Sequence, residues 1–299
     1  MGETGIIIAQ LALWLRSRRK NQNFLIPPSH QKFIQPVGSP QADFLLDSDA
    51  RNKQVGQLAL SIHDAPVPAT ADFGALLLET ASWALWENAS GLYTLLIKEA
   101  QPPRLAQINH KFTRGDLFCD MSAQEHPIYP PGELEIRLYS IWLAQFGDLI
   151  LHASGAIRDG RGYCFLGEAG AGKSTLARVL AQDPEATILG EDSLILRHLN
   201  GRFWIFGTPW HLDPDFCSPA GAPLEKLFFL DRSKPNGINL APPIDGISQV
   251  LKTAVIPYYH PGWLSRIIEN LVLLSGLVPF FEFSYHLGAD AWALIRDAG

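Results

Sequence analysis

A glycine-rich segment near the middle of the chain has the residue types and spacing of a phosphate-binding loop. Residues 167–174 are Gly-Glu-Ala-Gly-Ala-Gly-Lys-Ser, which fits the Walker A pattern GxxxxGK[ST] in full. Glycines let successive backbone N–H groups turn toward one anion, the lysine reaches the outer phosphates, and the hydroxyl holds Mg²⁺. We therefore expect ATP and Mg²⁺ to bind here, with the nucleotide contacted by Gly167, Ala169, Gly170, Ala171, Gly172, Lys173, Ser174 and Thr175.

Two adjacent carboxylates follow the next apolar run of the sequence. Residues 186–190 form that run, and Glu191 and Asp192 come directly after it. A phosphate-binding enzyme needs acids at such a place, because one carboxylate can hold Mg²⁺ while another orients or deprotonates the attacking group. Adjacent residues on a strand point to opposite faces, so we expect different roles for the two acids. The alternative is an exposed turn without chemistry.

A predicted hairpin brings a histidine to the loop. Residues 149–158 and 161–166 are expected to be strands, because Asp159-Gly160 between them is a strong two-residue turn signal. In that register His152 would lie opposite Gly167, beside the first turn of the phosphate loop. A histidine there could hydrogen-bond the transferred phosphate or orient an acceptor hydroxyl. The alternative is a histidine that only packs at the edge of the core.

A second hairpin carries a polar and aromatic loop toward the two acids. Asn200-Gly201 is expected to join strands 193–199 and 202–206, and the ladder should end at Pro209, which has no N–H to donate. The residues that follow the ladder are expected to bind the phosphate acceptor, namely Thr208, Trp210 and His211. Trp210 could equally be an anchor that packs the loop down.

The order of the remaining elements predicts an α/β protein of two domains. The cluster of proline and glycine over residues 127–132 indicates a domain edge, which gives an N-terminal domain of residues 1–130 and a second domain of residues 131–299. The first is expected to be a small α+β unit with a helix around residues 74–87. In the second, helices 133–146, 264–274 and 289–297 and a strand 278–283 accompany the hairpins, so its sheet should be mixed.

Composition limits the classes of partner. The 299 residues carry a formal net charge of −6, which repels nucleic acid and anionic membranes, and three cysteines without CxxC spacing indicate a reducing compartment. The longest apolar run, residues 6–15, is too short to span a membrane. With the basic residues 16–20 it could form a membrane-surface helix, but a short helix packed on the domain is the favoured interpretation. We expect a cytoplasmic protein.

From about residue 148 onward the chain resembles the kinase domain of the HPr kinase/phosphorylase family. The matching parts are Leu151-His152, the loop from Gly167 to Thr175, Leu189-Gly190-Glu191-Asp192, the segment 208–210, the strand 224–230 and the stretch 278–294. The resemblance implies a P-loop kinase domain with a mixed sheet, and a Mg²⁺-dependent transfer of the γ-phosphate of ATP to a serine hydroxyl. It implies that His152, Lys173, Glu191 and Asp192 are catalytic, with Ser174 and Asp192 holding the metal.

Two departures from that family bear on the base and on the acceptor. Glu191 occupies a position that is usually Asp, so either Glu191 or Asp192 could be the base. The arginine-rich segment with which the bacterial regulators bind HPr is missing, so HPr itself is not the expected substrate. The chain is more similar to looser relatives associated with the modification of ribosomally made peptides, which implies a peptide or protein acceptor recognised by residues 1–130. Alternatives are a nucleotide-dependent switch that transfers no phosphate and a small-molecule phosphotransferase. Homo-oligomerisation stays open.

Overall fold

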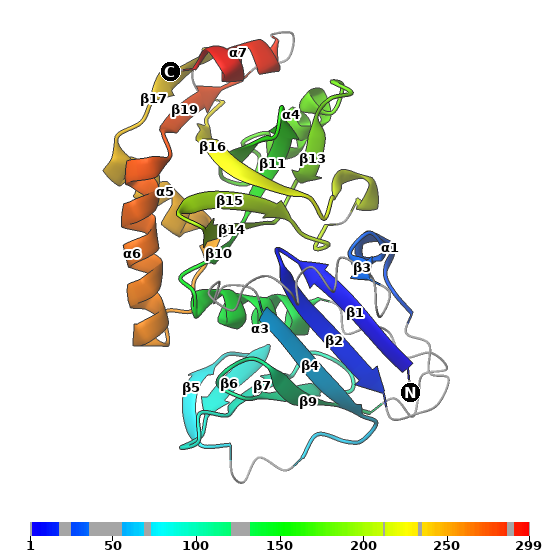
Figure 1. Cartoon of the computed structure of the whole chain (residues 1–299). Helices are drawn as coiled ribbons and strands as arrows, with labels where there is room; N and C mark the ends of the chain where they lie inside the picture. The colour runs from blue at the N-terminus through cyan, green and yellow to red at the C-terminus, as the bar shows by residue number, and fades with distance from the viewer. Residues whose placement is uncertain are drawn as a thin grey trace. The chain divides into compact units, whose positions relative to one another are not determined.

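The chain divides into two compact units, Met1–Trp142 and Leu143–Gly299, in a computed structural model (Figure 1). It describes residues 2–17, 25–35, 56–68, 73–120, 132–211, 213–232, 235–285 and 290–298. The predicted boundary between residues 130 and 131 borders residues 121–131, which lie outside the described part. The observed division falls instead within helix α3 (Glu133–Ala144), because the first turns of this helix pack on the N-terminal sheet.

The first unit is built on one mixed sheet of nine strands in the order β3-β1-β2-β4-β9-β8-β7-β6-β5. A single short helix, α1 (Pro28–Gln31), accompanies α3 among its described residues. The strands are β1 (Gly2–Ile8), β2 (Leu11–Ser17), β3 (Ile34–Gln35), β4 (Gly56–His63), β5 (Ala75–Glu79), β6 (Trp83–Glu87), β7 (Tyr93–Ile97), β8 (Arg104–Ile108) and β9 (Arg114–Cys119).

Two helices predicted for this unit are strands. The apolar run of residues 6–15 forms the hairpin of β1 and β2, which turns at Ala9 and Gln10 with positive φ angles. Residues 74–87 form the hairpin of β5 and β6, in which Thr80 accepts from and donates to the backbone of Trp83. Short apolar runs fit a helix and a strand almost equally well, and strand pairing with distant segments decides between them.

Helix α3 packs on one face of the N-terminal sheet through aromatic side chains. The Trp142 ring stacks on Phe112 with a centroid distance of 6.1 Å, and the hydroxyl of buried Tyr139 donates to the carbonyl oxygen of Leu11 at 3.3 Å. A buried pair, His30 Nε2 to Glu135 Oε2 at 2.7 Å, ties α1 to the same helix. These contacts bury one side of the sheet.

The second unit contains a mixed sheet of ten strands. The order β13-β11-β12-β16-β15-β14-β10-β18 forms the main path, and β19 pairs with β16 and β17. The strands are β10 (Leu149–Leu151), β11 (Ala153–Arg158), β12 (Arg161–Leu166), β13 (Thr187–Gly190), β14 (Leu194–Leu199), β15 (Arg202–Gly207), β16 (Gly221–Leu230), β17 (Gly237–Leu240), β18 (Ala254–Val255) and β19 (Phe280–Ser284).

This sheet has two halves, one containing β11, β12, β13 and β19 and the other containing β10, β14 and β15. They are joined by β16 and by the chain at His152. The first residues of β16 pair antiparallel with β15, and its last residues pair parallel with β12 and β19. The predicted strand 149–158 is broken at His152: β10 pairs with β14, whereas β11 pairs with β12 and β13. The break places residue 152 where the two halves diverge.

Helices cover both faces of the half that contains β12. Helix α4 (Lys173–Leu180) contacts β11, β13 and α7 (Ala291–Asp297), and a shared core joins them with alternate residues of the strands, including Phe165, Phe228 and Phe283. Helix α5 (Pro243–Thr253) contacts α6 (Pro261–Leu277) and the opposite face, where Gly246 meets the Phe280 ring (Figure 1). The second unit is therefore layered as an α/β structure.

The two hairpins have the predicted registers. Arg158 pairs with Arg161 and Ala153 with Leu166 in the first, and the second ladder ends at the pair of Leu194 and Gly207, short of Pro209. The predicted helices 133–146, 264–274 and 289–297 correspond to α3, α6 and α7, and the strand 278–283 to β19. All three cysteines are free thiols. Among the described residues, no helix has the length and apolar character that crossing a membrane requires.

Candidate functional site

The glycine-rich segment connects a buried strand to a helix, as its pattern requires. Strand β12 ends at Leu166 and α4 begins at Lys173, so the loop spans residues 167–172. Gly170 and Gly172 have φ angles of +84° and +102°, a conformation that costs other residues about 1–2 kcal/mol. The N–H of Ala171 donates to the carbonyl oxygen of Glu168 at 3.1 Å, which closes the turn. The predicted nucleotide contacts therefore belong to one tight loop at the start of a helix.

Lys173 lies across this loop with its amine held by backbone oxygens. The Nζ atom donates to the carbonyl oxygens of Gly167 at 2.7 Å and Glu168 at 3.3 Å, and the residue is 6% exposed. Burial lowers the pKa of the amine, and the charge of Asp192 opposes that shift. The lysine and the second acid of the predicted pair are thus close enough to interact electrostatically.

The two acids follow β13 and have different surroundings. Glu191 is buried, with Oε2 at 3.8 Å from Nη2 of Arg178 on α4, and this oxygen accepts no hydrogen bond within the described part of the chain. Asp192 is half-buried, and its negative charge partly opposes the lowering of the pKa that burial causes in Lys173 and His211. The two carboxylates therefore differ in burial and in partners: Glu191 lies near Arg178, whereas the charge of Asp192 acts on Lys173.

His152 is linked to this group by a hydrogen bond to the backbone of Asp192. Its side chain is exposed, its N–H donates to the carbonyl oxygen of Thr253 at 2.7 Å, and Nδ1 donates to the carbonyl oxygen of Asp192 at 2.9 Å. The β11–β12 ladder has the predicted register but ends at the pair of Ala153 and Leu166, so His152 and Gly167 follow directly after its last pair. With Nδ1 as the donor, Nε2 of a neutral ring is left as an acceptor.

The loop after the second hairpin contributes one histidine to the same region. Burial lowers the pKa of His211 to about 4, and its Nδ1 has no hydrogen-bond partner among the described residues. The ring lies against Gly190, where a Cβ atom would be 2.4 Å from Nε2. This contact explains why a glycine ends β13 just before the two acids.

Thr208 and Trp210, the other predicted acceptor residues, differ in exposure. Thr208 is fully buried, and its hydroxyl donates to the carbonyl oxygen of Ser193 at 2.9 Å. The predicted contact of Thr208 with an acceptor is therefore wrong, because the side chain orders the loop instead. Trp210 is half-buried, so its indole has both a packed and an accessible part.

Arg232 is a site residue that the sequence analysis did not identify. Strand β16 runs parallel to β12, with Phe229 beside Leu166, so the residues that follow both strands meet at one edge of the sheet. The Arg232 guanidinium lies so near Gly172 that a Cβ atom there would be 2.5 Å from Nε. The signal available in sequence was a basic residue just after a buried strand, but the pairing of β16 with β12 was needed to use it.

A cavity of about 410 Å³ opens beside the loop. It is lined by loop residues on one side and by residues from β16, α5 and β19 on the other: Gly167, Glu168, Ala169, Ala171, Phe229, Leu230, Asp231, Arg232, Gln249 and Glu282. Ligands of open α/β sheets bind at the carboxyl ends of parallel strands, and this cavity is at that edge. Its size falls within the usual range for small-molecule sites.

The donor groups fit a nucleotide with magnesium. Two cationic side chains, Lys173 and Arg232, flank the loop, and the hydroxyl of Ser174 and the carboxylate of Asp192 are the hard oxygen donors that Mg²⁺ prefers. No cluster of three or more His, Cys, Asp or Glu side chains with metal-binding geometry occurs in the described ranges. A magnesium ion here would therefore take further ligands from phosphate oxygens and water.

The chain matches no protein-family profile and no curated protein. Its structure is similar to that of the Hpr(Ser) kinase/phosphatase from Coxiella burnetii, with 18% sequence identity, 49% of this chain and 86% of that chain covered, and a TM-score of 0.27. At this TM-score the likeness does not establish what the chain does. The function must therefore be argued from the geometry around the phosphate loop.

Proposed function

We propose that this protein is an ATP-dependent kinase that transfers the γ-phosphate to a hydroxyl group, that of a serine in a peptide or protein. One observation carries the proposal: Lys173 of a complete phosphate-binding loop interacts with Asp192, whose backbone oxygen also holds His152. A loop that only binds nucleotide needs no histidine and second acid at its mouth. The sequence resemblance to HPr kinases supports the same assignment.

Each residue has a role in this proposal. The backbone N–H groups of the loop bind phosphate oxygens, and Lys173 and Arg232 neutralise phosphate charge as it shifts during transfer. Ser174 and Asp192 hold Mg²⁺, which supplies positive charge to the phosphate oxygens when it is bound. Lys173 must exchange its present contacts with the oxygens of Gly167 and Glu168 for the phosphates.

Glu191, His152 and His211 are the residues that act on the phosphate acceptor in this proposal. Glu191 has a buried carboxylate oxygen that accepts no hydrogen bond in the described residues, so it can take the proton of the attacking hydroxyl. His152, whose Nδ1 donates to the backbone oxygen of Asp192, steadies the transferring group through Nε2. His211 is neutral at pH 7, because its pKa is about 4, and together with Trp210 it contacts the acceptor.

A direct assay tests the proposal. The full chain is incubated with γ-labelled ATP, Mg²⁺ and candidate acceptors, including peptides encoded beside it, and both free phosphate and labelled product are followed. Label on an acceptor serine supports the kinase, and Lys173→Ala should abolish it while melting remains normal. Unchanged transfer by Lys173→Ala would refute the assignment, and phosphate release that no acceptor affects would favour a nucleotide switch.

Separate changes of the two acids test how their roles divide. Asp192→Asn should raise the Mg²⁺ concentration needed for half-maximal activity, because the metal loses a carboxylate ligand. Glu191→Gln should lower kcat with little change in that Mg²⁺ requirement, because the hydroxyl loses its base. The opposite pattern would exchange the two assignments.

A further inference from the structure

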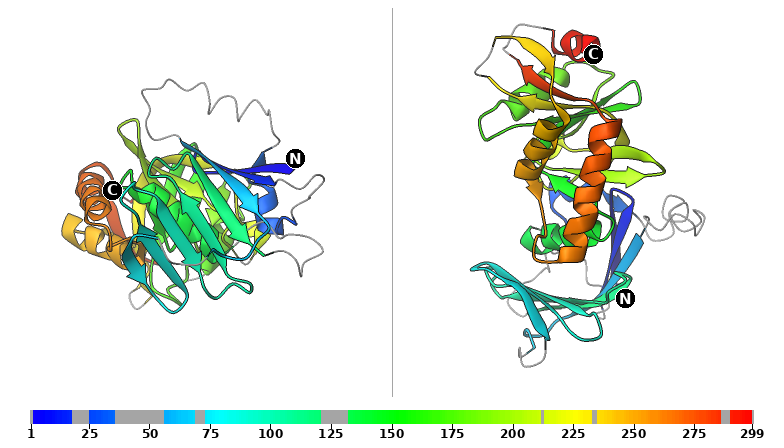
Figure 2. Two further views of the ribbon diagram at one scale, coloured as in Figure 1. Left: turned by 90° about the horizontal axis from the view of Figure 1, so that it is seen from below. Right: turned by 90° about the vertical axis from the view of Figure 1, so that its left-hand side faces the viewer.

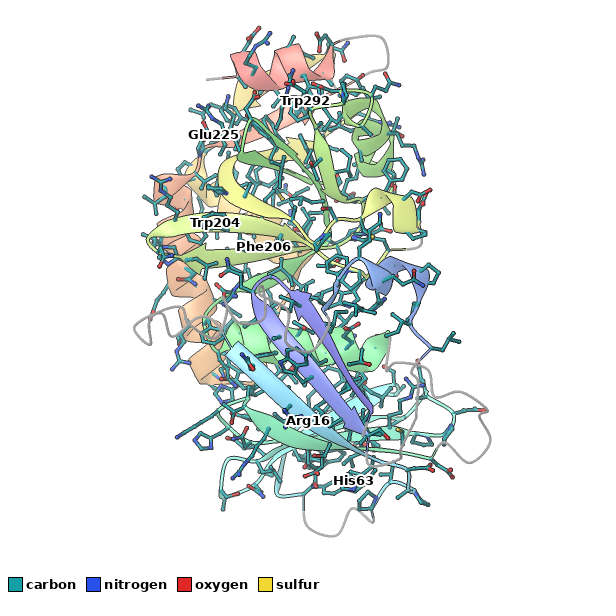
Figure 3. All side chains as sticks on the ribbon, turned by 45° about the vertical axis from the view of Figure 1, so that its right-hand side comes forward. Arg16, His63, Trp204, Phe206, Glu225 and Trp292 are labelled. Carbon is teal, nitrogen blue, oxygen red and sulfur yellow. The ribbon has the colours of Figure 1, made fainter. Side chains whose placement is uncertain are left out.

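Ser154 is a fully buried serine of β11 whose side chain faces helix α4. Its relative exposure is 0%, and it pairs with Phe165 of β12. Paired residues point to the same face of a sheet, and Phe165 belongs to the core that also contains Leu176 of α4. Figure 3 labels Trp292 of the same core, and Figure 2 (right) looks onto α5 and α6, which lie on the opposite face.

The register of β11 and β13 places Glu191 opposite Ser154. The residue after Ser154 pairs with the residue before Glu191. The residue before Ser154, Ala153, donates its N–H to the carbonyl oxygen of Asp192 at 3.2 Å, which continues the same antiparallel register. Directly opposed residues of an antiparallel pair have Cβ atoms about 4.5–5.5 Å apart, so the two side chains are neighbours.

Both side chains have a buried polar atom without a partner. Oγ of Ser154 and Oε2 of Glu191 make no hydrogen bond with any residue that the structure describes. Oε2 lies 3.8 Å from Nη2 of Arg178, which is too long for a hydrogen bond but places the carboxylate on the face that α4 covers. A buried polar group without a partner lowers stability, so its presence needs a reason. Here an unpaired hydroxyl donor faces an unpaired carboxylate acceptor.

We propose that Ser154 is a positioning residue for Glu191, and that its hydroxyl donates to the Glu191 carboxylate when nucleotide and acceptor are bound. Hydrogen bonds of catalytic groups are often long or misaligned in the free protein and tighten when the substrate binds. The inference rests on the proposed function, in which Glu191 takes the proton of the acceptor hydroxyl. As that proton leaves, the hydroxyl oxygen bonds to the γ-phosphorus, and the bond from this phosphorus to the oxygen of the departing ADP breaks.

A carboxylate held in this way affects the rate of transfer rather than the binding of nucleotide. The Glu191 side chain has several rotatable bonds, and a hydrogen bond from Ser154 restricts it to the conformation that meets the acceptor. Ser154 is fully buried and does not line the cavity of about 410 Å³ beside the phosphate loop. Loss of its hydroxyl should therefore lower kcat and leave the KM for ATP unchanged.

Two variants of the same shape isolate the hydroxyl. Threonine and valine are both β-branched and nearly equal in volume, but only threonine has a hydroxyl. The full chain is assayed with γ-labelled ATP, Mg²⁺ and the acceptor found by the direct assay. Ser154→Val should lower kcat by about tenfold or more, Ser154→Thr by under about threefold, and both should keep the KM for ATP within about twofold. Equal kcat values in the two variants, whether high or low, would overturn the inference.

Ser154→Ala gives a second measurement, in which no volume is added to the core. This variant should lose as much kcat as Ser154→Val but melt at or above the wild-type temperature, because it removes a buried hydroxyl without a partner. In a Glu191→Gln protein the same change should lower the remaining kcat by under about twofold, because there is no base left to position. A lowered melting temperature, or a full loss of kcat in that background, would show that the hydroxyl does not act through Glu191.

Lys173→Ala separates this inference from the proposed function. If the wild type transfers phosphate and Lys173→Ala does not, an unchanged kcat in Ser154→Ala refutes only the role of Ser154. If the wild type transfers no phosphate, or Lys173→Ala transfers it equally well, the proposed function fails. The role of Ser154 then fails with it, because there is no base to position.

Discussion

The half-buried histidine at the candidate site makes the stability of the second unit depend on pH. His211 has an ordinary pKa of 6.5 that burial lowers to about 4, so the unfolded chain binds a proton at a pH where the folded chain does not. Stability from this group is fully present above pH 6.5 and is lost as the pH falls through the folded value. Each unit of pKa shift corresponds to about 1.4 kcal/mol. The full pKa shift of His211 therefore contributes about 3 kcal/mol to the free energy of unfolding.

A smaller pH interval gives a practical measurement. Between about pH 7.5 and about pH 5 the linkage relation gives a loss of about 2 kcal/mol in the free energy of unfolding. Urea denaturation at the two pH values, followed by tryptophan fluorescence, measures it in the wild type and in His211→Gln. Glutamine does not titrate, so the variant should lose about 2 kcal/mol less than the wild type over the same interval.

The comparison between the two proteins isolates His211 from all other titrating groups. Carboxylates and other histidines contribute equally to both pH dependences, and their effects cancel in the difference. If the wild type and His211→Gln lose the same stability, the histidine is not kept neutral by burial. The packing of its ring on Gly190 would then not describe the folded state in solution.

Further predictions concern the buried ion pair and the phosphate loop. Asp148 and Arg197 form a fully buried ion pair with Arg197 Nε 2.8 Å from Asp148 Oδ2. Asp148→Asn should lower the free energy of unfolding in urea by about 3–5 kcal/mol, whereas Arg161→Gln, in an exposed pair, should lower it by under about 1 kcal/mol. Similar losses in the two variants would contradict this. Gly172→Ala should abolish binding of a fluorescent ATP analogue, because the φ angle of +102° and the Arg232 guanidinium exclude a Cβ atom; retained binding would show that the loop adapts. Arg232→Ala should weaken ATP binding at least tenfold in calorimetry without lowering the melting temperature, and an unchanged affinity would remove Arg232 from the site.

Local turn chemistry made the hairpins predictable. Asp159-Gly160 and Asn200-Gly201 all have positive φ angles, as their residue types favour, and each turn fixes the register of its two strands. The connection of strand β12 to helix α4 by a glycine-rich loop could also be predicted, because the glycines, the lysine and the flanking elements are contiguous in sequence. Features that depend on a few neighbouring residues were therefore predicted correctly.

Features that depend on the pairing of segments far apart in the sequence were not predicted. The parallel pairing of β12 with β16 joins segments about 60 residues apart and brings Arg232 to the loop, but no residue near either strand specifies it. The hairpin over residues 74–87 was predicted as a helix for another reason: its pairings are local, but its turn at residues 80–82 contains no Gly, Asn or Asp to signal it. His152 shows both effects, since the register was correct but the strand ended one residue earlier than expected.

Asp192 connects the site through two separate parts of the same residue. Its backbone oxygen accepts from the ring of His152 and from the N–H of Ala153, whereas its carboxylate charge acts on Lys173 and His211. Asp192→Asn removes the charge but leaves the backbone oxygen in place, so His152 should keep its position. A loss of activity in this variant would therefore report on the carboxylate alone, which makes it the sharpest single test of a metal-binding or catalytic role for this acid.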